Sequence, residues 1–338
     1  MKDIKDYCLG ELKNLLEKEN YPGFCAQQIF GWIYKKRVKD FNSMANIPKE
    51  LKNFLRENFY LSSIALLKKE KSQDSTEKFL FKLKDGLAIE TVLIPQGLRS
   101  TLCVSTQVGC KFKCTFCASG KKGLKRNLTS SEIINQYLNI SGPASINKVT
   151  NIVFMGIGEP LDNFENTIKS IKILTDSAGI GFPERRISIS TCGLVPQIEE
   201  LARLNLGIKL SISLHSADDA ARSKLMPVNK QYPLKELIPA VRRFSRAMKY
   251  PVTFEYALIG DINTKKSDAE KLANLMKTIK GKVNLIPYNG ISHKFKPPTQ
   301  QAIESFKEEL KKRGVLFTSR KSRGQDINAA CGQLMIKL

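Results

Sequence analysis

Hydrophobic residues near the beginning of the chain recur every three to four positions, the period of a helix with one buried face. Three such stripes lie within residues 1–60. They are Leu9/Leu12/Leu15/Leu16, Cys25/Ile29/Trp32/Ile33 and Leu51/Phe54/Leu55, the last behind Pro48, which suits a first helical turn. The pattern predicts a small N-terminal helical domain over residues 1–60.

From residue 77 the period changes to two, which is typical of a strand with one buried face. Phe79 and Phe81 alternate with polar neighbours, Asp85-Gly86 marks a tight turn, and LAIETVLIP returns as a second strand. We expect a β-hairpin extension over residues 61–99 that leads into the core.

Glu90 lies on the second strand of this hairpin, on the same face as Val92 and Ile94. Burying an unpaired carboxylate among apolar neighbours is costly and raises its pKa. From the pattern alone, an exposed edge strand is therefore favoured, and a functional carboxylate is the alternative.

After residue 100, short β-rich runs alternate with helical patterns to the end of the chain. The runs are TLCVS, VTNIVFMG, RISIST, IKLSISL, VTFEYALIG, KVNLIP and VLFTS. Among the helical patterns, residues 129–140 open with a Thr129…Glu132 capping box, and residues 234–248 place apolar side chains on one face. Six βα units over residues 100–338 predict an α/β fold in which helices cover a parallel sheet. The sheet is expected to be open, or to form a full or partial barrel.

Small and polar residues end several of these strands. Each has an ordinary interpretation as a turn, a cap or a hydrogen-bonded core residue. Because active sites in such folds lie where strands end, we expect them to form a ring of donors and acceptors suited to a cofactor with an amino acid and a ribose. The residues are Gly158, Glu159, Ser190, Ser213, His215 and Asn289.

The chain has 55 Lys and Arg residues against 32 Asp and Glu, a formal net charge of +23. An excess of this size favours a polyanionic partner such as RNA, because pairing with phosphates releases counterions. One basic cluster, KKGLKR, adjoins a cysteine-rich segment. A second basic cluster lies in the helical domain and consists of Lys35, Lys36, Arg37 and Lys39. The alternative is a Lys-rich surface that is only solvated.

Cys110, Cys114 and Cys117 form a C-x3-C-x2-C triplet. Three thiolates would leave one iron of a [4Fe–4S] cube open for another ligand, whereas a structural zinc would need a fourth protein ligand. No second CxxC and no Cys/His pair lies nearby to supply one. The spacing, with Phe116 before the last cysteine, resembles the signature of radical S-adenosylmethionine (SAM) enzymes.

The other five cysteines are scattered along the chain: Cys8, Cys25, Cys103, Cys192 and Cys331. The N-terminus MKDIKDYCLG lacks the apolar run of a signal peptide, and no apolar stretch approaches the roughly 18 residues of a membrane span. We therefore expect free thiols, a cytoplasmic location and no membrane association.

A narrower resemblance rests on RGQDINAACGQL together with TLCVSTQVGC, FMGIGEPLDN, SISTCG, SLHSADDAARSKLMPVNKQYPL and NLIPYN. With these motifs, and with FCAQQIFGWIYKKRVKDF near the N-terminus, nearly the whole chain resembles the RlmN/Cfr family of radical SAM RNA adenine methyltransferases. The resemblance implies a partial (βα)6 radical SAM barrel with an N-terminal helical domain. It also implies one [4Fe–4S] cluster on Cys110, Cys114 and Cys117.

The same resemblance assigns roles to further residues. Gly158, Glu159, Ser190, Ser213, Leu214, His215 and Asn289 would line the SAM site. Cys331 would carry the methyl group, Cys103 would be its redox partner and Glu90 the proton acceptor, which replaces the edge-strand interpretation of Glu90. Cys192, where relatives often have serine, is expected to be a small packed residue.

The implied reaction uses two SAM molecules per turnover. One methylates Cys331, the other yields a radical that activates this methyl group for addition to adenine, and a transient Cys103–Cys331 disulfide releases the covalent protein–RNA adduct. The implied partners are RNA and an electron donor such as a flavodoxin or ferredoxin system, and we expect a monomer.

The resemblance implies a target in the peptidyl-transferase centre of 23S rRNA and also the tRNA adenine next to the anticodon. GEP at 158–160 and Val108 favour methylation at C2, with C8 as the alternative. A tRNA methylthiotransferase would need a second cysteine triplet. The alternative from another functional class is a non-catalytic RNA-binding protein with a structural zinc site.

Overall fold

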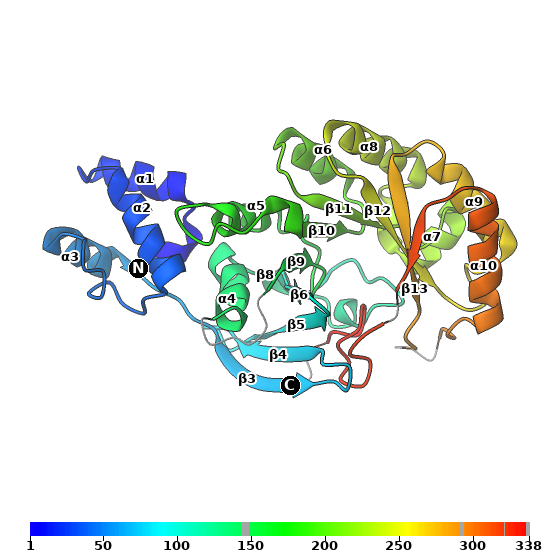
Figure 1. The fold of residues 1–338 in the computed structure, drawn as a ribbon, viewed down its shortest axis with the longest axis horizontal. Helices are drawn as coiled ribbons and strands as arrows, with labels where there is room; N and C mark the ends of the chain where they lie inside the picture. The colour runs from blue at the N-terminus through cyan, green and yellow to red at the C-terminus, as the bar shows by residue number, and fades with distance from the viewer. Residues whose placement is uncertain (143–148, 291–293, 321, 336–338) are drawn as a thin grey trace.

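A ten-stranded sheet forms the centre of the protein (Figure 1). The computed structural model describes residues 1–142, 149–290, 294–320 and 322–335. In spatial order the strands are β14 (Phe317–Ser319), β13 (Gly281–Pro287), β12 (Val252–Leu258), β11 (Lys209–Ser213), β10 (Ile187–Thr191), β9 (Asn151–Phe154), β6 (Arg99–Cys103), β5 (Ala88–Gln96), β4 (Glu77–Lys82) and β3 (Ala65–Lys71).

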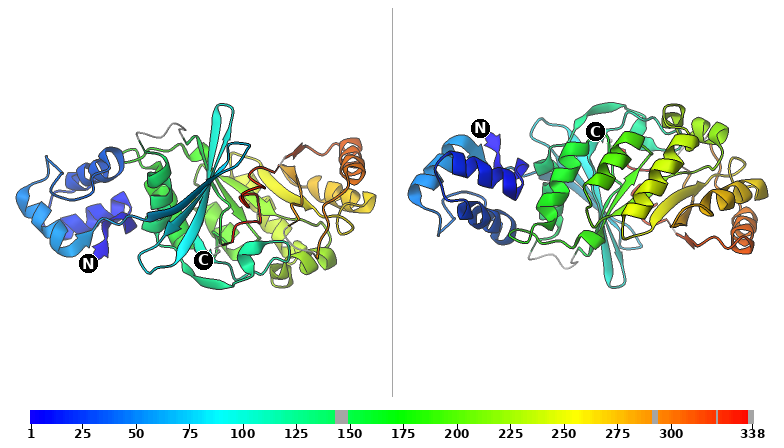
Figure 2. Two further views of the ribbon diagram at one scale, coloured as in Figure 1. Left: turned by 90° about the horizontal axis from the view of Figure 1, so that it is seen from below. Right: turned by 90° about the horizontal axis from the view of Figure 1, so that it is seen from above.

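Within this sheet, the seven strands β6, β9, β10, β11, β12, β13 and β14 run parallel, and all seven predicted β-rich runs are confirmed as strands. Helices follow these strands and cover one face of the sheet, which Figure 2 shows from above. They are α4 (Ser130–Ile140), α5 (Phe164–Thr175), α6 (Val195–Arg203), α7 (Asp219–Leu225), α8 (Leu234–Ala247), α9 (Lys266–Met276) and α10 (Gln300–Lys312). Among the described residues no ladder joins β14 to β3, so the structure is the open form of the predicted α/β fold, a partial barrel.

The other end of the sheet is antiparallel. β4 and β5 form the predicted hairpin around Asp85-Gly86, where Gly86 has a φ of 85° that only glycine adopts freely. β5 continues through a second tight turn into β6, which opposes Val92 to Cys103. β3, which pairs with β4 at the edge of the sheet, was not predicted, because ALLKKEK is almost fully exposed and shows no alternation of buried and exposed positions.

The edge-strand interpretation of Glu90 is wrong. β5 is an internal strand between β4 and β6, and Glu90 is buried. The error has a physical cause: periodicity shows which face of a strand is apolar, but it does not show how many neighbours the strand has.

The first sixty residues form the predicted helices, which lie at one end of the molecule (Figure 1). They are α1 (Leu9–Lys18), α2 (Phe24–Phe30), a π-helical segment (Gly31–Lys36) and α3 (Lys49–Asn58), and β1 (Lys2–Asp3) pairs with β2 (Phe59–Tyr60) beside them. Their buried stripes join the same hydrophobic cluster as the barrel. In the described part of the chain, no helix has the length and apolar character that crossing a membrane requires.

The tail after β14 crosses the sheet on the face away from the helices, as the view from below shows (Figure 2). There a second, smaller hydrophobic cluster joins tail residues to three strands. It consists of Val92, Cys103, Val153, Ile157, Ala329 and Leu334. The tail is thereby placed over β5, β6 and β9.

Candidate active site

The cysteine triplet lies in a loop whose ends are paired. β7 (Gln107–Gly109) and β8 (Leu124–Asn127) form a two-stranded antiparallel sheet on either side of the loop. Close packing there requires Gly109, since a Cβ at this position would meet the Gly123 carbonyl oxygen at 1.9 Å, and its φ is 84°.

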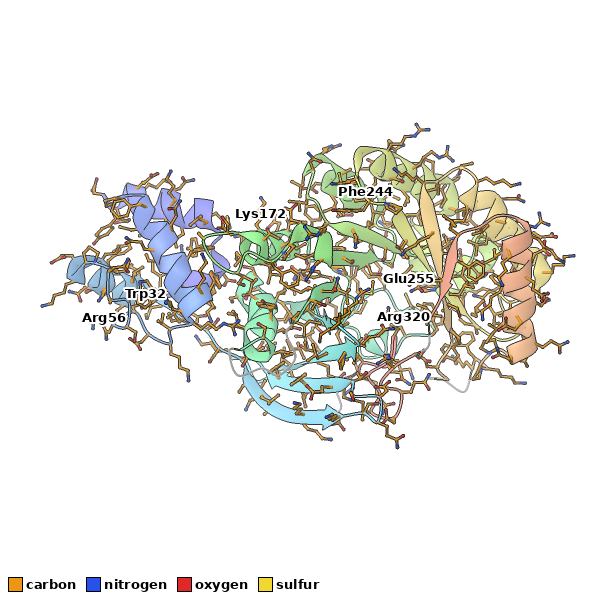
Figure 3. All side chains as sticks on the ribbon, in the orientation of Figure 1. Trp32, Arg56, Lys172, Phe244, Glu255 and Arg320 are labelled. Atoms are coloured by element: carbon orange, nitrogen blue, oxygen red, sulfur yellow. The ribbon has the colours of Figure 1, made fainter. Side chains whose placement is uncertain are left out.

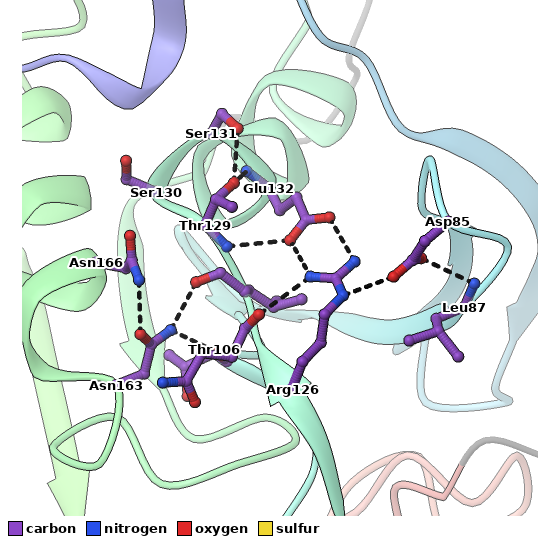
Figure 4. A network of polar contacts seen from close by, with 12 residues as sticks. Asp85, Leu87, Thr106, Arg126, Thr129, Ser130, Ser131, Glu132, Asn163 and Asn166 are labelled. Atoms are coloured by element: carbon purple, nitrogen blue, oxygen red, sulfur yellow. Dashed lines mark hydrogen bonds and ion pairs between the residues drawn. The ribbon is translucent and has the colours of Figure 1, made fainter. Parts of the chain in front are cut away.

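Arg126 anchors this loop to the surrounding structure (Figure 4). Its guanidinium donates to both carboxylate oxygens of Glu132 at 2.7 and 2.8 Å and to Asp85 at 2.6 Å. Glu132 in turn accepts from the Thr129 N–H at 3.0 Å, which completes the predicted capping box of α4. The loop is therefore tied both to α4 and to the β4–β5 turn.

All three cysteines of the triplet line one pocket at the carboxyl ends of the parallel strands. Six of the seven residues predicted for the SAM site line the same pocket. They are Gly158, Glu159, Ser190, Ser213, His215 and Asn289. Leu214 is fully buried in the core, and the structure does not bring its side chain to the pocket wall.

The three thiols of this pocket form a donor set that suits an iron–sulfur cluster. A [4Fe–4S] cube takes one thiolate on each of three irons and leaves the fourth iron open to another ligand. Cys110, Cys114 and Cys117 would supply these three thiolates from one loop, and the rest of the pocket lining offers polar groups for that ligand. The residues present therefore fit the cube.

Glu159 shapes this pocket through its side chain. Its two carboxylate oxygens accept from the Leu161 N–H at 3.0 Å and from the Cys192 N–H at 2.7 Å. Burial raises the pKa of this carboxyl, and these hydrogen bonds oppose the rise. Glu159 thus joins the ends of β9 and β10, and Cys192 beside it is packed in the core as predicted.

His215 is buried and neutral. Its Nδ1 accepts from the Ala257 N–H at 2.9 Å, and its ring meets Phe116 edge-on, with 4.7 Å between centroids. Burial lowers the pKa of this imidazole to about 3, and the charge of Arg222 adds to the effect. His215 therefore offers its remaining ring nitrogen without a charge.

Sequence reasoning missed Arg222, a fully buried arginine on α7. It donates to the carbonyl oxygens of Leu214 and Cys192 at 3.2 and 2.7 Å and to Asn229 Oδ1 at 2.6 Å. These bonds hold the ends of β10 and β11 together under the pocket. Nothing in ARSKLMPVNK distinguishes this arginine from the charged face of an exposed helix.

Glu255 and Arg320, both labelled in Figure 3, were missed as well. Both line the pocket. Glu255 is buried on β12 and accepts from Asn284 Nδ2 at 2.7 Å. Glu90 was singled out as one carboxylate within an apolar strand. The run VTFEYALIG shows the same signal at Glu255. Arg320 follows β14 within the basic run SRKSR, where nothing in the sequence distinguishes it from its basic neighbours.

Cys103 and Cys331 line a second pocket, directly beside the first. Cys331 and Arg320 line both pockets, and both cysteines are free thiols. Burial raises the pKa of Cys103 to about 12, the nearby Cys331 adds to the rise, and Arg320 opposes it. The structure therefore brings the tail cysteine, more than 200 residues away in sequence, to its predicted partner and to the edge of the triplet's pocket.

Glu90 lies on the same sheet face as Cys103 but lines a different, neighbouring pocket. Its carboxylate is 3.4 Å from the ammonium of Lys78, and its other oxygen, Oε2, accepts no hydrogen bond within the described residues. Burial raises the pKa of Glu90, and Lys78 is the main opposing influence. An oxygen of this kind has the capacity to take a proton.

The fold and the site together define a radical SAM enzyme. Residues 104–276 match the family model of the radical SAM superfamily, and residues 2–61 match that of the ribosomal RNA large subunit methyltransferase N-terminal domain. A crystal structure of a radical SAM methyltransferase from Sphaerobacter thermophilus, 42% identical, superimposes with a TM-score of 0.91 and covers 98% of this chain and 99% of that one.

Close relatives in sequence narrow this class. The probable dual-specificity RNA methyltransferase RlmN of Clostridium novyi (strain NT) is 44% identical over 99% of this chain and 98% of its own length. The dual-specificity RNA methyltransferase RlmN of a Nitratiruptor species is 44% identical over 100% and 98%. The chain belongs to the RlmN family, whose cofactors are a [4Fe–4S] cluster and SAM.

Proposed function

We propose that this protein methylates C2 of adenine in RNA, at a specific adenine in the peptidyl-transferase centre of 23S rRNA and at the tRNA adenine next to the anticodon. The names of its relatives, dual-specificity RNA methyltransferases at 44% identity over nearly the whole chain, support the RNA substrates. The observation that carries the proposal is the shared pocket of Cys103 and Cys331 beside the pocket of the cysteine triplet.

In this proposal Cys110, Cys114 and Cys117 hold the cluster, and the strand-end residues of the same pocket hold SAM. When bound, these two cofactors supply the methyl group and the one-electron chemistry that activates it. An electron-poor ring carbon such as C2 does not displace a methyl group from a sulfonium by itself, so the protein needs an intermediate carrier.

Cys331 is that carrier. A thiolate is a soft nucleophile suited to accepting a methyl group. The residue is exposed and lies in the tail, and it lines both pockets, so it can face SAM on one side and a target base on the other.

Two further residues release the product. Glu90 takes the C2 proton of the adenine adduct on its unpartnered oxygen. Cys103 attacks the Cys331 sulfur, so that a transient disulfide forms while the bond from this sulfur to the transferred carbon breaks, and its electron pair stays with that carbon. Because the pKa of Cys103 is about 12, this attack requires that its proton be removed as it reacts.

RNA binding is assigned to exposed lysines on two elements. Lys121, Lys122 and Lys125 are exposed beside the cysteine loop, and Lys35 and Lys36 are exposed on the helical domain of residues 1–60. Arg126 is engaged with Glu132 and Asp85 and belongs to the scaffold. Such contacts predict an RNA affinity that falls steeply with added salt. We also propose a monomer in the cytoplasm, reduced by a flavodoxin or ferredoxin.

Mass spectrometry of RNA nucleosides tests the proposal. The anaerobically reconstituted protein is incubated with SAM, a reductant and either 23S rRNA or tRNA. The expected product is 2-methyladenosine in both RNAs. Recovery of 8-methyladenosine, or of no methylated adenosine, would overturn the assignment.

The Cys103→Ala variant tests the release step. It is expected to accumulate a covalent protein–RNA adduct, visible as a shifted band in denaturing gels that nuclease treatment removes. Full turnover by this variant would contradict the disulfide step.

A further inference from the structure

The tail that carries Cys331 is held by the turn between β3 and β4. Asp326 accepts from Ser72 Oγ at 2.6 Å and from the Gln73 N–H at 3.2 Å, and the Gly324 N–H donates to Asp74 at 2.9 Å. We call these contacts, between residues 72–74 and 324–326, the hairpin clasp. The clasp joins two segments that lie about 250 residues apart, and one of them precedes Cys331 by only a few positions.

Lys78 follows the clasp on β4 and contacts three separate groups. Its ammonium donates to the Ile327 carbonyl oxygen in the tail at 2.6 Å. It also lies 3.4 Å from Glu90 Oε1 on β5 and 3.1 Å from Glu70 Oε2 on β3. An ammonium has three N–H donors, so these three acceptors match its full capacity.

The strand register explains these contacts. Lys78 stands directly opposite Glu70 on β3 and opposite Val92 on β5, which makes Glu90 its diagonal neighbour on the same face. The Lys78 side chain is only 10% exposed, and that of Glu90 is 7% exposed. A buried ammonium placed between a carboxylate and a backbone carbonyl fixes the positions of both.

We propose that Lys78 is a positioning residue that ties the Glu90 carboxylate to the tail segment preceding Cys331, so that the proton acceptor and the methyl carrier take their places together. The inference rests on the proposed roles of Glu90 and Cys331. Lys78 itself touches neither the target base nor a cofactor.

The charges around Glu90 determine the direction of the effect. The charged side chains that line its pocket are Lys78, Glu70, Lys68 and Lys121, and the backbone of Met335 approaches from the tail. Burial raises the pKa of Glu90, Lys78 lowers it, and Glu70 raises it. Because a proton acceptor must be ionised, loss of Lys78 shifts the acid limb of the pH profile to higher pH, and loss of Glu70 shifts it to lower pH.

The experiment compares Lys78→Met with the wild type by two measurements. The first is the rate of product release from the protein–RNA adduct as a function of pH, where we expect a rate about tenfold lower on the acid side, which corresponds to a limb shift of about one pH unit. The second is hydrogen–deuterium exchange of residues 324–331 in the reconstituted protein without RNA. We expect faster exchange there, because the Ile327 carbonyl loses its donor.

Three variants serve as controls. Lys78→Arg keeps a cation and should restore both measurements toward the wild type. Glu70→Gln keeps Lys78 and should move the limb in the opposite direction while the tail stays protected. Lys69→Met removes a neighbouring lysine that pairs with Glu77 at 2.9 Å, and should change neither measurement.

The outcomes separate this inference from the proposed function. If Glu90→Gln releases product like the wild type, Glu90 is not the acceptor and the proposed function fails at that step. If Glu90→Gln stalls but Lys78→Met behaves like the wild type in either measurement, the inference is wrong and the proposed function stands. If Lys78→Met does not fold, the opposite limb shift of Glu70→Gln decides, and its absence overturns the inference.

Discussion

The two neighbouring pockets are built in different ways. The pocket of the cysteine triplet is formed by the ends of parallel strands, and its polar groups are locked by buried partners, as Glu159 and Arg222 show. The pocket of Cys103 and Cys331 is closed on one side by a tail, which is held by the hairpin clasp and by Lys78.

This difference indicates that the two pockets have different functions. The first pocket cannot change shape without breaking contacts of the core, which suits a site that must hold reactive cofactors in one geometry. The second can open by breaking the hydrogen bonds of the tail and its small hydrophobic cluster, without disturbing the main core. This suits a carrier that must face SAM first and RNA afterwards. The comparison predicts that substitutions in the first pocket affect folding and cofactor content together, whereas those in the tail affect transfer alone.

The largest expected effect in the tail is that of Cys331→Ala. Without the methyl carrier, RNA methylation should fall at least about a thousandfold, toward the detection limit, while SAM is still cleaved to 5′-deoxyadenosine. Mass spectrometry of nucleosides and chromatography of the cleavage product measure the two activities separately. Cys8→Ser, at a half-buried cysteine of the helical domain, is the matched control and should keep both. Methylated RNA from Cys331→Ala would contradict the carrier role.

In the first pocket the largest effect is expected from Arg222→Met. The change leaves several carbonyl oxygens and Asn229 without their donor in the core, and should lower the free energy of unfolding by about 3 to 5 kcal/mol. Chemical denaturation measures the stability, and iron analysis after reconstitution should show reduced cluster content. Arg126→Met, which removes two partly exposed ion pairs, should cost only about 1 to 2 kcal/mol. Full stability of Arg222→Met would contradict the rigid description of this pocket.

The parallel half of the fold was predictable because its signals are local. Runs such as RISIST and IKLSISL are apolar, rich in β-branched residues and bounded by polar segments, and each one is a strand in the structure. Parallel strands end at the same edge, so Ser190, Ser213 and Asn289 could be expected to meet. The cysteine triplet could be recognised as a cluster site without knowledge of the fold, because the spacing of its three cysteines is itself the signal.

The contacts of the tail could not be read in the same way. Lys78 and Asp326 look like ordinary surface charges, and their partners lie about 250 residues away, so no periodicity links them. β3 was not predicted, because its side chains are exposed on both faces. Glu70, the carboxylate on β3 that faces Lys78, was therefore not identified either. The role of Cys331 was accessible only through family resemblance, because an isolated cysteine in a polar tail has no pattern of its own.

His215 gives the first pocket a smaller, pH-dependent signature. Its pKa is about 3 in the folded protein and about 6.5 when unfolded, so its contribution to stability is fully present above pH 6.5 and is lost as the pH falls toward 3. At pH 5 the loss is on the order of 2 kcal/mol. Glu159 and Glu255, whose pKa values are raised by burial, act in the opposite direction because they take up protons more readily in the folded state.

The variant His215→Asn isolates the contribution of this histidine to the pH dependence of stability. Asparagine tolerates the positive φ of 54° at this position, and its side-chain oxygen can accept from the Ala257 N–H as Nδ1 does. Denaturation curves at pH 7 and pH 5 should show a smaller loss of stability for the variant than for the wild type. An equal loss in both proteins would show that His215 does not hold a depressed pKa.

The smallest effect is expected at the hairpin clasp, where Asp326→Asn weakens two hydrogen bonds to an exposed carboxylate. Because the tail contributes little to the main core, the melting temperature should not change, while the rate of RNA methylation should fall by about tenfold or less. Asp40→Asn is a close control, since Asp40 is likewise exposed and accepts from one serine hydroxyl and one backbone N–H, both of Ser43, in the helical domain. A similar loss of rate in both variants would point to a general effect of charge on RNA binding. A loss confined to Asp326→Asn, with faster hydrogen exchange in residues 324–331, would show that the second pocket depends on docking of the tail in a way that the first does not.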